Sequence, residues 1–216
     1  MTSSDLISGK PKKSLADQIY EQTLEMIVRS PDMVDQVINE NRLTELFHVS
    51  KAPVREALVR LTSEGVLHSV PRYGYVVERI SPIDRKVVVD QRIYLEQKAL
   101  TISFPNMTDD NLAGIRQQLE KASRKENVDV WTVWEDNIEF HLLLASFAGS
   151  NVLNRFLQQC LSIQERMYAE TVWSKRNNLV DSIDMKPHET IYRKIESRDF
   201  EGSMNQLKLD IESSLK

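Results

Sequence analysis

The stretch Ser50-Lys51-Ala52-Pro53-Val54-Arg55-Glu56-Ala57-Leu58-Val59-Arg60-Leu61 decides the fold of the N-terminal part of the chain. Ser50 is a good helix N-cap, and Pro53 falls in the first helical turn, where a missing N–H costs little. An apolar stripe follows at positions i, i+3, i+4 and i+7, formed by Val54, Ala57, Leu58 and Leu61. The stretch therefore predicts an amphipathic helix with one buried face.

The opposite face of this predicted helix carries positive charge. Lys51 and Arg55 are four residues apart, so they share a face away from the apolar stripe. The small Ala52 between them allows close approach, and an Arg can read guanine in the major groove of DNA with two hydrogen bonds. Ser50 could bond a phosphate at the helix N-terminus, and Arg42 is a further phosphate candidate. On charge alone, however, Lys51 and Arg55 could equally be solvated surface charges.

The segments before this helix predict two more helices. Residues 1–13 are a polar stretch that we expect to be a flexible arm. Ser14 and Asp17 have the spacing of a capping box for the first helix. Residues 37–38 could form a short strand, and Asn39 is a plausible cap for a short second helix.

The segment after the helix predicts a hairpin. Gly65 is a good left-handed helix terminator. Residues 66–70 and 75–80 then have the composition of two strands around a turn that contains Arg72, Tyr73 and Gly74. The order helix, helix, short turn, helix, hairpin predicts a winged helix-turn-helix over residues 14–80. Its wing turn could press against the DNA backbone or enter the minor groove.

The rest of the chain, residues 81–216, predicts an all-helical domain. Ser81-Pro82 marks a fresh helix start, because Pro is favoured at the first helical position. Helical spacing then indicates six helices, at roughly 82–103, 108–126, 129–147, 151–173, 184–197 and 200–215. The predicted fold is mainly α: the winged helix-turn-helix followed by an antiparallel helical bundle.

Composition excludes several classes of protein. Hydrophobic residues make up 41% and charged residues 28%, an ordinary globular balance rather than a disordered one. The single Cys160 excludes an intrachain disulfide and a Cys-based zinc site. No apolar run approaches the ~20 residues that span a bilayer, and residues 1–13 lack the apolar core of a signal peptide. We therefore expect a cytoplasmic protein without a membrane partner.

Net charge does not support DNA binding by itself. The formal net charge is −4, and residues 1–80 hold ten Lys or Arg against eleven Asp or Glu. A basic excess is the usual footprint of a nucleic-acid binder. The expectation of DNA binding therefore depends on where the charges are placed.

Three segments of the N-terminal part strongly resemble the GntR family of bacterial repressors: residues 43–61, residues 64–67 and residues 71–77. The V-S-[KR]-x-P-V-R-E-A-L pattern at residues 49–58 is highly specific to that family. The resemblance implies that base and phosphate contacts fall on Ser50, Lys51, Arg55 and Gly74, with Asn41 or Arg42 nearby.

Two departures from the family pattern fall in this part of the chain. The family usually has Arg where Lys51 stands, so the bidentate guanidinium fork is lost at that position. Its Pro-Gly turn before the second helix is replaced here by Val34-Asp35. Neither departure changes the expected fold, although operator preference could differ.

The C-terminal part resembles the FadR-type effector domain of the same family, also called the FCD domain. Residues 92–96 match its R-x-x-L-E helix, residues 137–141 with 148–151 match its D-x-x-F-H…N pattern, and residues 188–210 match its terminal helix pair. These motifs are less specific than the N-terminal ones. Together, the two resemblances cover nearly the whole chain.

Many domains of this type hold a divalent metal through one Asp and three His, and the metal binds a carboxylate effector. By position, the resemblance implies the ligands Asn137, His141, His188 and Asp210 in this chain. Asn replaces the usual Asp, and Asp replaces the final His. Two oxygens and two imidazoles still make a usable site for zinc, nickel or manganese. The alternative is that His141 and His188 bind no metal and are ordinary polar residues of a bundle interior.

Arg92 could clamp an effector carboxylate if its side chain points into the bundle. Alternatively, Arg92 is an ordinary surface arginine. The sequence predicts a dimeric transcriptional regulator, a repressor, that binds a double-stranded DNA operator under the control of a small carboxylate effector.

Two other functions compete with that of a regulator. The helical domain could be a metal-dependent enzyme with a degenerate DNA-binding module, but only Glu139 and Glu189 are spare general bases near the two histidines. Alternatively, the protein could be a DNA-binding regulator whose effector pocket has lost its metal. We expect a regulator and not an enzyme.

Overall fold

The computed structural model describes residues 13–30, 36–125, 130–174 and 186–213. Residues 1–12 of the predicted arm, and the Val34-Asp35 departure, lie outside the described residues. The chain divides into two compact units, residues 1–79 and residues 80–216.

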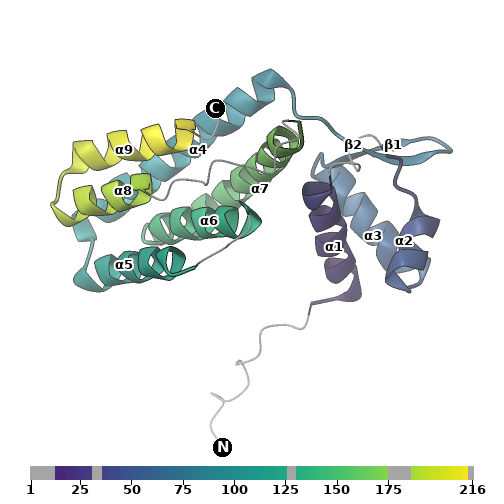
Figure 1. Cartoon of the computed structure of the whole chain (residues 1–216), viewed down its shortest axis with the longest axis horizontal. Helices are drawn as coiled ribbons and strands as arrows, with labels where there is room; N and C mark the ends of the chain where they lie inside the picture. Colours follow the sequence, from purple (N-terminus) through teal and green to yellow (C-terminus); the bar gives the residue numbers. More distant parts are fainter. Residues whose placement is uncertain (1–12, 31–35, 126–129, 175–185, 214–216) are drawn as a thin grey trace, which may run out of the picture. The chain divides into compact units, whose positions relative to one another are not determined.

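The described residues of the first unit form three helices and a two-stranded antiparallel sheet: α1 (Leu15–Arg29), α2 (Glu40–Phe47), α3 (Lys51–Ser63), β1 (Leu67–Val70) and β2 (Gly74–Val77) (Figure 1). The predicted capping box is present at α1, because Ser14 accepts from the backbone N–H of Asp17 and the Asp17 side chain accepts from the Ser14 N–H. Asn39 caps α2 through the N–H of Arg42. The described part of this unit is therefore a winged helix-turn-helix, as predicted.

The apolar stripe of α3 forms the centre of this unit. Val54, Ala57, Leu58 and Leu61 are at most 2% exposed, which confirms the stripe read from the sequence. They pack in one cluster with buried residues of every other element, among them Ile19, Leu43, Leu67 and Val77. Because one face of α3 is buried in this way, the other face is presented outward.

The base of the wing requires glycine at residue 74. Ile38 forms an isolated bridge with Tyr75, through two backbone hydrogen bonds of 2.8 Å. Gly74 has φ +130°, and a Cβ there would lie 2.5 Å from the carbonyl oxygen of Ile38. Only glycine allows this approach without strain. The short strand predicted at residues 37–38 is thus reduced to the single bridge at Ile38.

The second unit is helical throughout its described residues, with α4 (Pro82–Ser103), the 3₁₀ turn η2 (Phe104–Asn106), α5 (Asp109–Ser123), α6 (Val130–Ser146), α7 (Asn151–Ser174), α8 (Lys186–Glu196) and α9 (Phe200–Ser213) (Figure 1). Ser81 caps α4, with Pro82 at its start. The predicted fold class is confirmed. None of the described helices is long and apolar enough to cross a membrane.

Helix α4 is the central element of this unit, because it packs against α6, α7 and α9. Helix α5 packs on α6 and α8, and α8 packs on α9. Apolar residues from these helices form the larger core cluster, including Leu100, Phe140, Ile191 and Leu207. Polar side chains on the inner face of α4 are therefore enclosed by other helices.

Candidate functional site

The outward face of α3 presents the residues predicted to contact DNA. Lys51 and Arg55 are exposed, on the side of α3 away from its buried stripe. Ser50 is the N-cap of α3, but its side chain makes no capping hydrogen bond. The Ser50 hydroxyl and the first N–H groups of α3 are thus available to an anion such as a DNA phosphate.

Arg55 is held by Glu40, a residue that the sequence did not single out. Nε and Nη2 of Arg55 donate to the two carboxylate oxygens of Glu40, at 3.1 and 3.0 Å. The hydrogen bond from Arg55 lowers the pKa of Glu40 below its usual value. Glu40 begins α2, so this pair ties the first turn of α2 to the guanidinium of α3. Nη1 of Arg55 takes no part in the pair.

The wing and α2 supply the other predicted DNA contacts. Arg72 has φ +69° in the wing turn and is exposed, and Tyr73 beside it is 72% exposed. Arg42 is exposed on α2, where its Nη1 donates to Oε1 of Gln36 at 3.0 Å. Every DNA-contact residue proposed from the sequence except Gly74 has an exposed side chain. Gly74 acts through its backbone.

Five buried charged or polar side chains form a continuous row of contacts inside the second unit. Nε of Arg92 donates to Oε1 of Glu96 at 2.6 Å, and Oε2 of Glu96 lies 2.6 Å from Nδ1 of His141. Nε2 of His141 lies 3.0 Å from Oδ2 of Asp210, which is also 3.5 Å from Nε2 of His188. Each of the five is at most 9% exposed. Arg92 thus points into the bundle.

Three of the four residues proposed as metal ligands come together in this row of buried polar side chains. His141, His188 and Asp210 each offer a ligand atom within 4.8 Å of the others. Asn137 is buried one turn before His141 on α6. Two ligands bound to zinc at ~2.0–2.1 Å in a tetrahedron are ~3.3 Å apart, and the separations of 3.0 and 3.5 Å lie on either side of that value.

The surroundings of His141 also fit a metal centre. A metal-binding His commonly donates its other ring nitrogen to a carboxylate, as Nδ1 of His141 meets Glu96 here. His188 differs, because its Nδ1 is buried and has no hydrogen-bond partner among the described residues. Phe140 stacks on the His188 ring, with centroids 4.1 Å apart, and so fixes its plane. The residues present therefore fit a divalent metal.

Opposite charges set the protonation of the cluster. Burial alone would raise the pKa of Glu96, but the charges of His141 and Arg92 outweigh it, so that pKa lies below its usual value. Burial and Arg92 oppose the charged form of His141, yet Glu96 and Asp210 raise its pKa overall. Burial lowers the pKa of His188, which favours a neutral imidazole, the form that binds metals. The pKa of Asp210 is lowered by the two histidines in spite of its burial.

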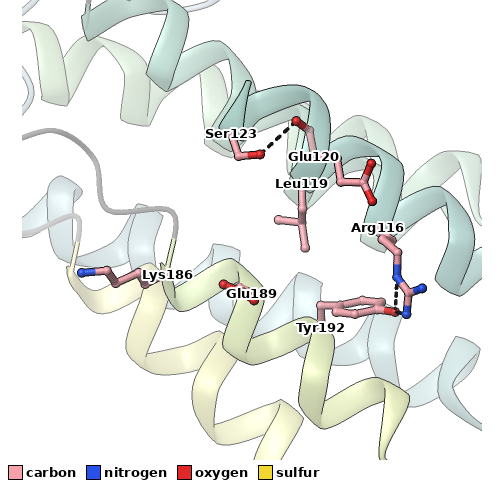
Figure 2. Close-up of a pocket in the computed structure, with 7 residues that line it drawn as sticks. All are labelled: Arg116, Leu119, Glu120, Ser123, Lys186, Glu189 and Tyr192. Carbon is pink, nitrogen blue, oxygen red and sulfur yellow. Dashed lines mark hydrogen bonds between the residues drawn. The ribbon is translucent and has the colours of Figure 1, made fainter. Parts of the chain in front are cut away.

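The two general bases considered for an enzyme do not belong to the cluster. Glu139 is exposed and pairs with Lys121 on α5, and Glu189 is exposed and pairs with Arg193 on α8. Glu189 instead lines a surface cleft of about 450 Å³ between α5 and α8, whose other walls include Arg116, Leu119 and Tyr192 (Figure 2). The side chains of the two candidate bases are therefore directed to the surface and not to the buried cluster of His141 and His188.

A second polar link joins α4 to α7 at the start of the helical unit. Arg85 pairs with Glu170 and donates to the carbonyl oxygens of Ile80 and Met167, at 3.2 Å each. Glu170 also accepts from the N–H of Ile80 at 3.4 Å. Both backbone groups of Ile80, the first residue of the second unit, are thus fixed to the helices behind it. The same two helices are joined deeper in the bundle by Arg92 and Gln164.

Two family models match the chain. Residues 15–77 match the bacterial regulatory proteins of the gntR family, and residues 88–213 match the FCD domain. The FCD match alone covers more than half of the chain. This is a family of transcription regulators and not of enzymes.

Individual relatives agree with this assignment. The chain is 28% identical over 143 residues to the HTH-type transcriptional regulator YdhC of Bacillus subtilis, a match over 65% of this chain and 64% of that protein. It is 23% identical over 181 residues to the HTH-type transcriptional repressor GlaR of Escherichia coli, over 80% of this chain and 81% of that protein. The solved structure of E. coli McbR/YncC has the same fold, with a TM-score of 0.76, 20% identity and coverage of 94% of this chain and 96% of that chain. The chain therefore belongs to the gntR family of bacterial regulatory proteins, and its helical unit is an FCD domain.

Proposed function

We propose that this protein is a transcriptional repressor that binds a DNA operator through α3 and the wing and releases it when a small carboxylate binds the helical unit. The observation that carries the DNA-binding half is the exposed pair Lys51 and Arg55 on a helix whose other face is buried. A helix of this kind enters the major groove and reads base edges. Repression is supported by relatives that are named repressors, GlaR among them.

The carboxylate effector would bind at Arg92. Nε and Nη1 of this guanidinium are used by Glu96 and Gln164, at 2.6 Å each. Its Nη2 is buried and has no hydrogen-bond partner among the described residues. A buried, unsatisfied guanidinium nitrogen favours a carboxylate oxygen as its partner.

A divalent metal would be held by His141, His188 and Asp210, with Asn137, one turn earlier than His141 on α6, as the fourth ligand. Zinc, nickel and manganese all accept nitrogen and oxygen ligands. When bound, the ion would supply positive charge for a second effector oxygen. Glu96 contacts both Arg92 and His141, so one carboxylate orients the effector clamp and a metal ligand together.

Helix α4 would carry the signal. Its residues Arg92 and Glu96 lie in the site, and Arg85, two turns earlier on the same helix, fixes Ile80, where the helical unit begins. A small shift of α4 against α7 would change both polar links at once. Coupling between an effector site and a binding site is typically ~1–3 kcal/mol.

A homodimer would present two copies of α3 to a palindrome. Ile83, Val87 and Tyr94 are 50–72% exposed and lie within ~40° of one another around α4, at ~100° per residue. Val152 and Phe156 are exposed on the neighbouring helix α7. Exposed apolar side chains along one face of α4 favour burial by a second subunit. Two-fold symmetry would set the recognition helices ~34 Å apart on the operator.

A gel-shift titration with palindromes from the region of the protein's own gene tests the proposal. We expect binding at low salt that weakens when a small carboxylate is added. Failure to bind any of these palindromes at low salt would contradict the DNA-binding half. Elemental analysis of the purified protein, with His141→Ala as control, tests the metal: a divalent ion should be present in the wild type and lost in the variant.

A further inference from the structure

The inner faces of α6 and α7 carry polar residues beyond the cluster described above. Trp134, Asn137 and His141 recur at i, i+3 and i+7 on α6, so they share one face of that helix. Gln164 and Tyr168 are four residues apart on α7, and Gln164 accepts from Arg92 at 2.6 Å. The two rows meet where Trp134 stacks on Tyr168, with ring centroids 5.0 Å apart and planes within 8°.

The stacked pair holds two polar atoms that are buried without a partner. Trp134 is 2% exposed, and its Nε1 has no hydrogen-bond acceptor among the described residues. The Tyr168 hydroxyl is likewise buried, with no hydrogen-bond partner in the described part of the chain. Buried Trp and Tyr side chains normally find a hydrogen-bond partner. Two unsatisfied groups carried by stacked rings therefore indicate a missing acceptor.

We propose that Trp134 and Tyr168 form the far wall of the effector site and select an acid that carries a second oxygen acceptor at the end remote from the carboxylate bound by Arg92. This inference rests on the proposed acid binding at Arg92. It adds the length and the chemistry of the far end of the ligand.

The spacing along α7 sets the length of such an acid. Gln164, which contacts Arg92, and Tyr168 are four residues apart, which is ~6 Å along a helix at ~1.5 Å per residue. Burial raises the pKa of Tyr168 to about 12, so its hydroxyl is protonated at neutral pH and can donate. The Trp134 N–H can only donate. Both groups therefore favour a carboxylate or carbonyl oxygen at the far end, and a dicarboxylate such as adipate has about this length.

Isothermal titration of the full chain with adipate and with hexanoate tests this inference. The two acids have the same number of carbons, but hexanoate lacks the second acceptor. We expect adipate to bind the wild type about tenfold more tightly than hexanoate, because a hydrogen bond to a charged group contributes about this much. Tyr168→Phe keeps the stacked ring and removes the hydroxyl, so it should abolish most of this preference and leave hexanoate binding unchanged. Tyr20→Phe is the matched control, because it removes a hydroxyl that bonds Glu64 in the winged unit, outside the helical unit, and it should change neither affinity.

The possible outcomes separate this inference from the proposed function. Equal affinity of the wild type for both acids would contradict the proposed role of Trp134 and Tyr168 and would leave acid binding at Arg92 intact. A preference for adipate that persists in both Tyr168→Phe and Trp134→Phe would do the same. A merely structural role for Tyr168 would lower the melting temperature and leave the ratio of the two affinities unchanged, which also overturns the inference. If neither acid binds, both the inference and the carboxylate class of the proposed effector are contradicted.

Discussion

The two units place their charged site residues in opposite environments. In the winged unit, Lys51, Arg55 and Arg72 are exposed. In the helical unit, Arg92 and Glu96 are at most 2% exposed and are paired with each other. An exposed charge keeps its water until a partner displaces it, whereas a buried charge depends on its partners for stability. Substitutions in the two units should therefore fail in different ways.

The largest effect should come from removing the charge of Glu96. Glu96→Gln takes the carboxylate from both Arg92 and His141, and breaking a buried ion pair typically costs about 3–5 kcal/mol. We expect the free energy of unfolding of the helical unit to fall by about that amount in urea denaturation. Glu139→Gln is the matched control, because Glu139 pairs with Lys121 at the surface, and should leave stability unchanged. Equal losses in the two variants would mean that burial does not distinguish them.

The next effect should appear in DNA binding without a change in stability. Arg55→Ala removes the side chain best placed to read guanine, so operator affinity should fall about 10- to 100-fold. Fluorescence anisotropy with a labelled operator measures this loss, and the melting temperature should stay at the wild-type value. Arg193→Ala removes an exposed arginine from the helical unit and should bind the operator normally. If Arg55→Ala binds as well as this control, α3 does not read the operator in the proposed way.

A smaller effect should follow from releasing Arg55 from Glu40. Glu40→Gln leaves the guanidinium a single, neutral oxygen acceptor in place of two charged ones, so discrimination between the operator and a copy with altered guanines should fall a few-fold. Because a negative charge is also lost near the DNA, non-specific binding should rise slightly. Glu45→Gln removes the same charge from an exposed position on α2 and should raise non-specific binding without loss of discrimination. An identical result for both variants would rule out a positioning role for Glu40.

The smallest effect is a difference between two tyrosines at high pH. Tyr20 in the winged unit and Tyr168 in the helical unit both have a pKa raised to about 12, chiefly by burial, but Tyr20 also bonds Glu64. A raised phenol pKa means that the fold favours the neutral form. The associated stability is complete below about pH 10 and is lost as the pH rises towards 12. In a spectrophotometric titration, Glu64→Gln should lower the pKa of Tyr20 and leave that of Tyr168 in place; a shift of both would contradict separate causes.

Local features of the fold could be predicted from the sequence because they depend on neighbouring residues. The stripe from Val54 to Leu61, the capping box at Ser14 and the start of α4 at Ser81 all lie where helical periodicity and capping chemistry placed them. Strand ends were less predictable. The second strand was expected to continue to residue 80, but β2 ends at Val77. The bridge at Ile38 depends on contact with Tyr75, which periodicity does not report.

The site was only partly predictable for the same reason. Positional resemblance named His141, His188 and Asp210, and the fold brings these three together. It did not name Glu96 as the partner of His141, because the two residues are 45 positions apart and meet only when α4 packs on α6. Glu40 and the pair of Trp134 with Tyr168 were missed likewise. Their roles come from tertiary contacts and unsatisfied polar atoms.

Operator release by acids in wild type and in Arg92→Met tests the central proposal most directly. A panel of small acids that includes acetate, hexanoate and adipate is titrated into the complex of the full chain with its operator, and anisotropy reports release. We predict that at least one acid weakens wild-type binding by about 5- to 150-fold. Arg92→Met removes one member of a buried ion pair, so its melting temperature is measured first, and the folded variant should still bind the operator but no longer respond to the same acid. An effect that persists in Arg92→Met, or the absence of any acid effect in the wild type, would contradict control of the operator through Arg92.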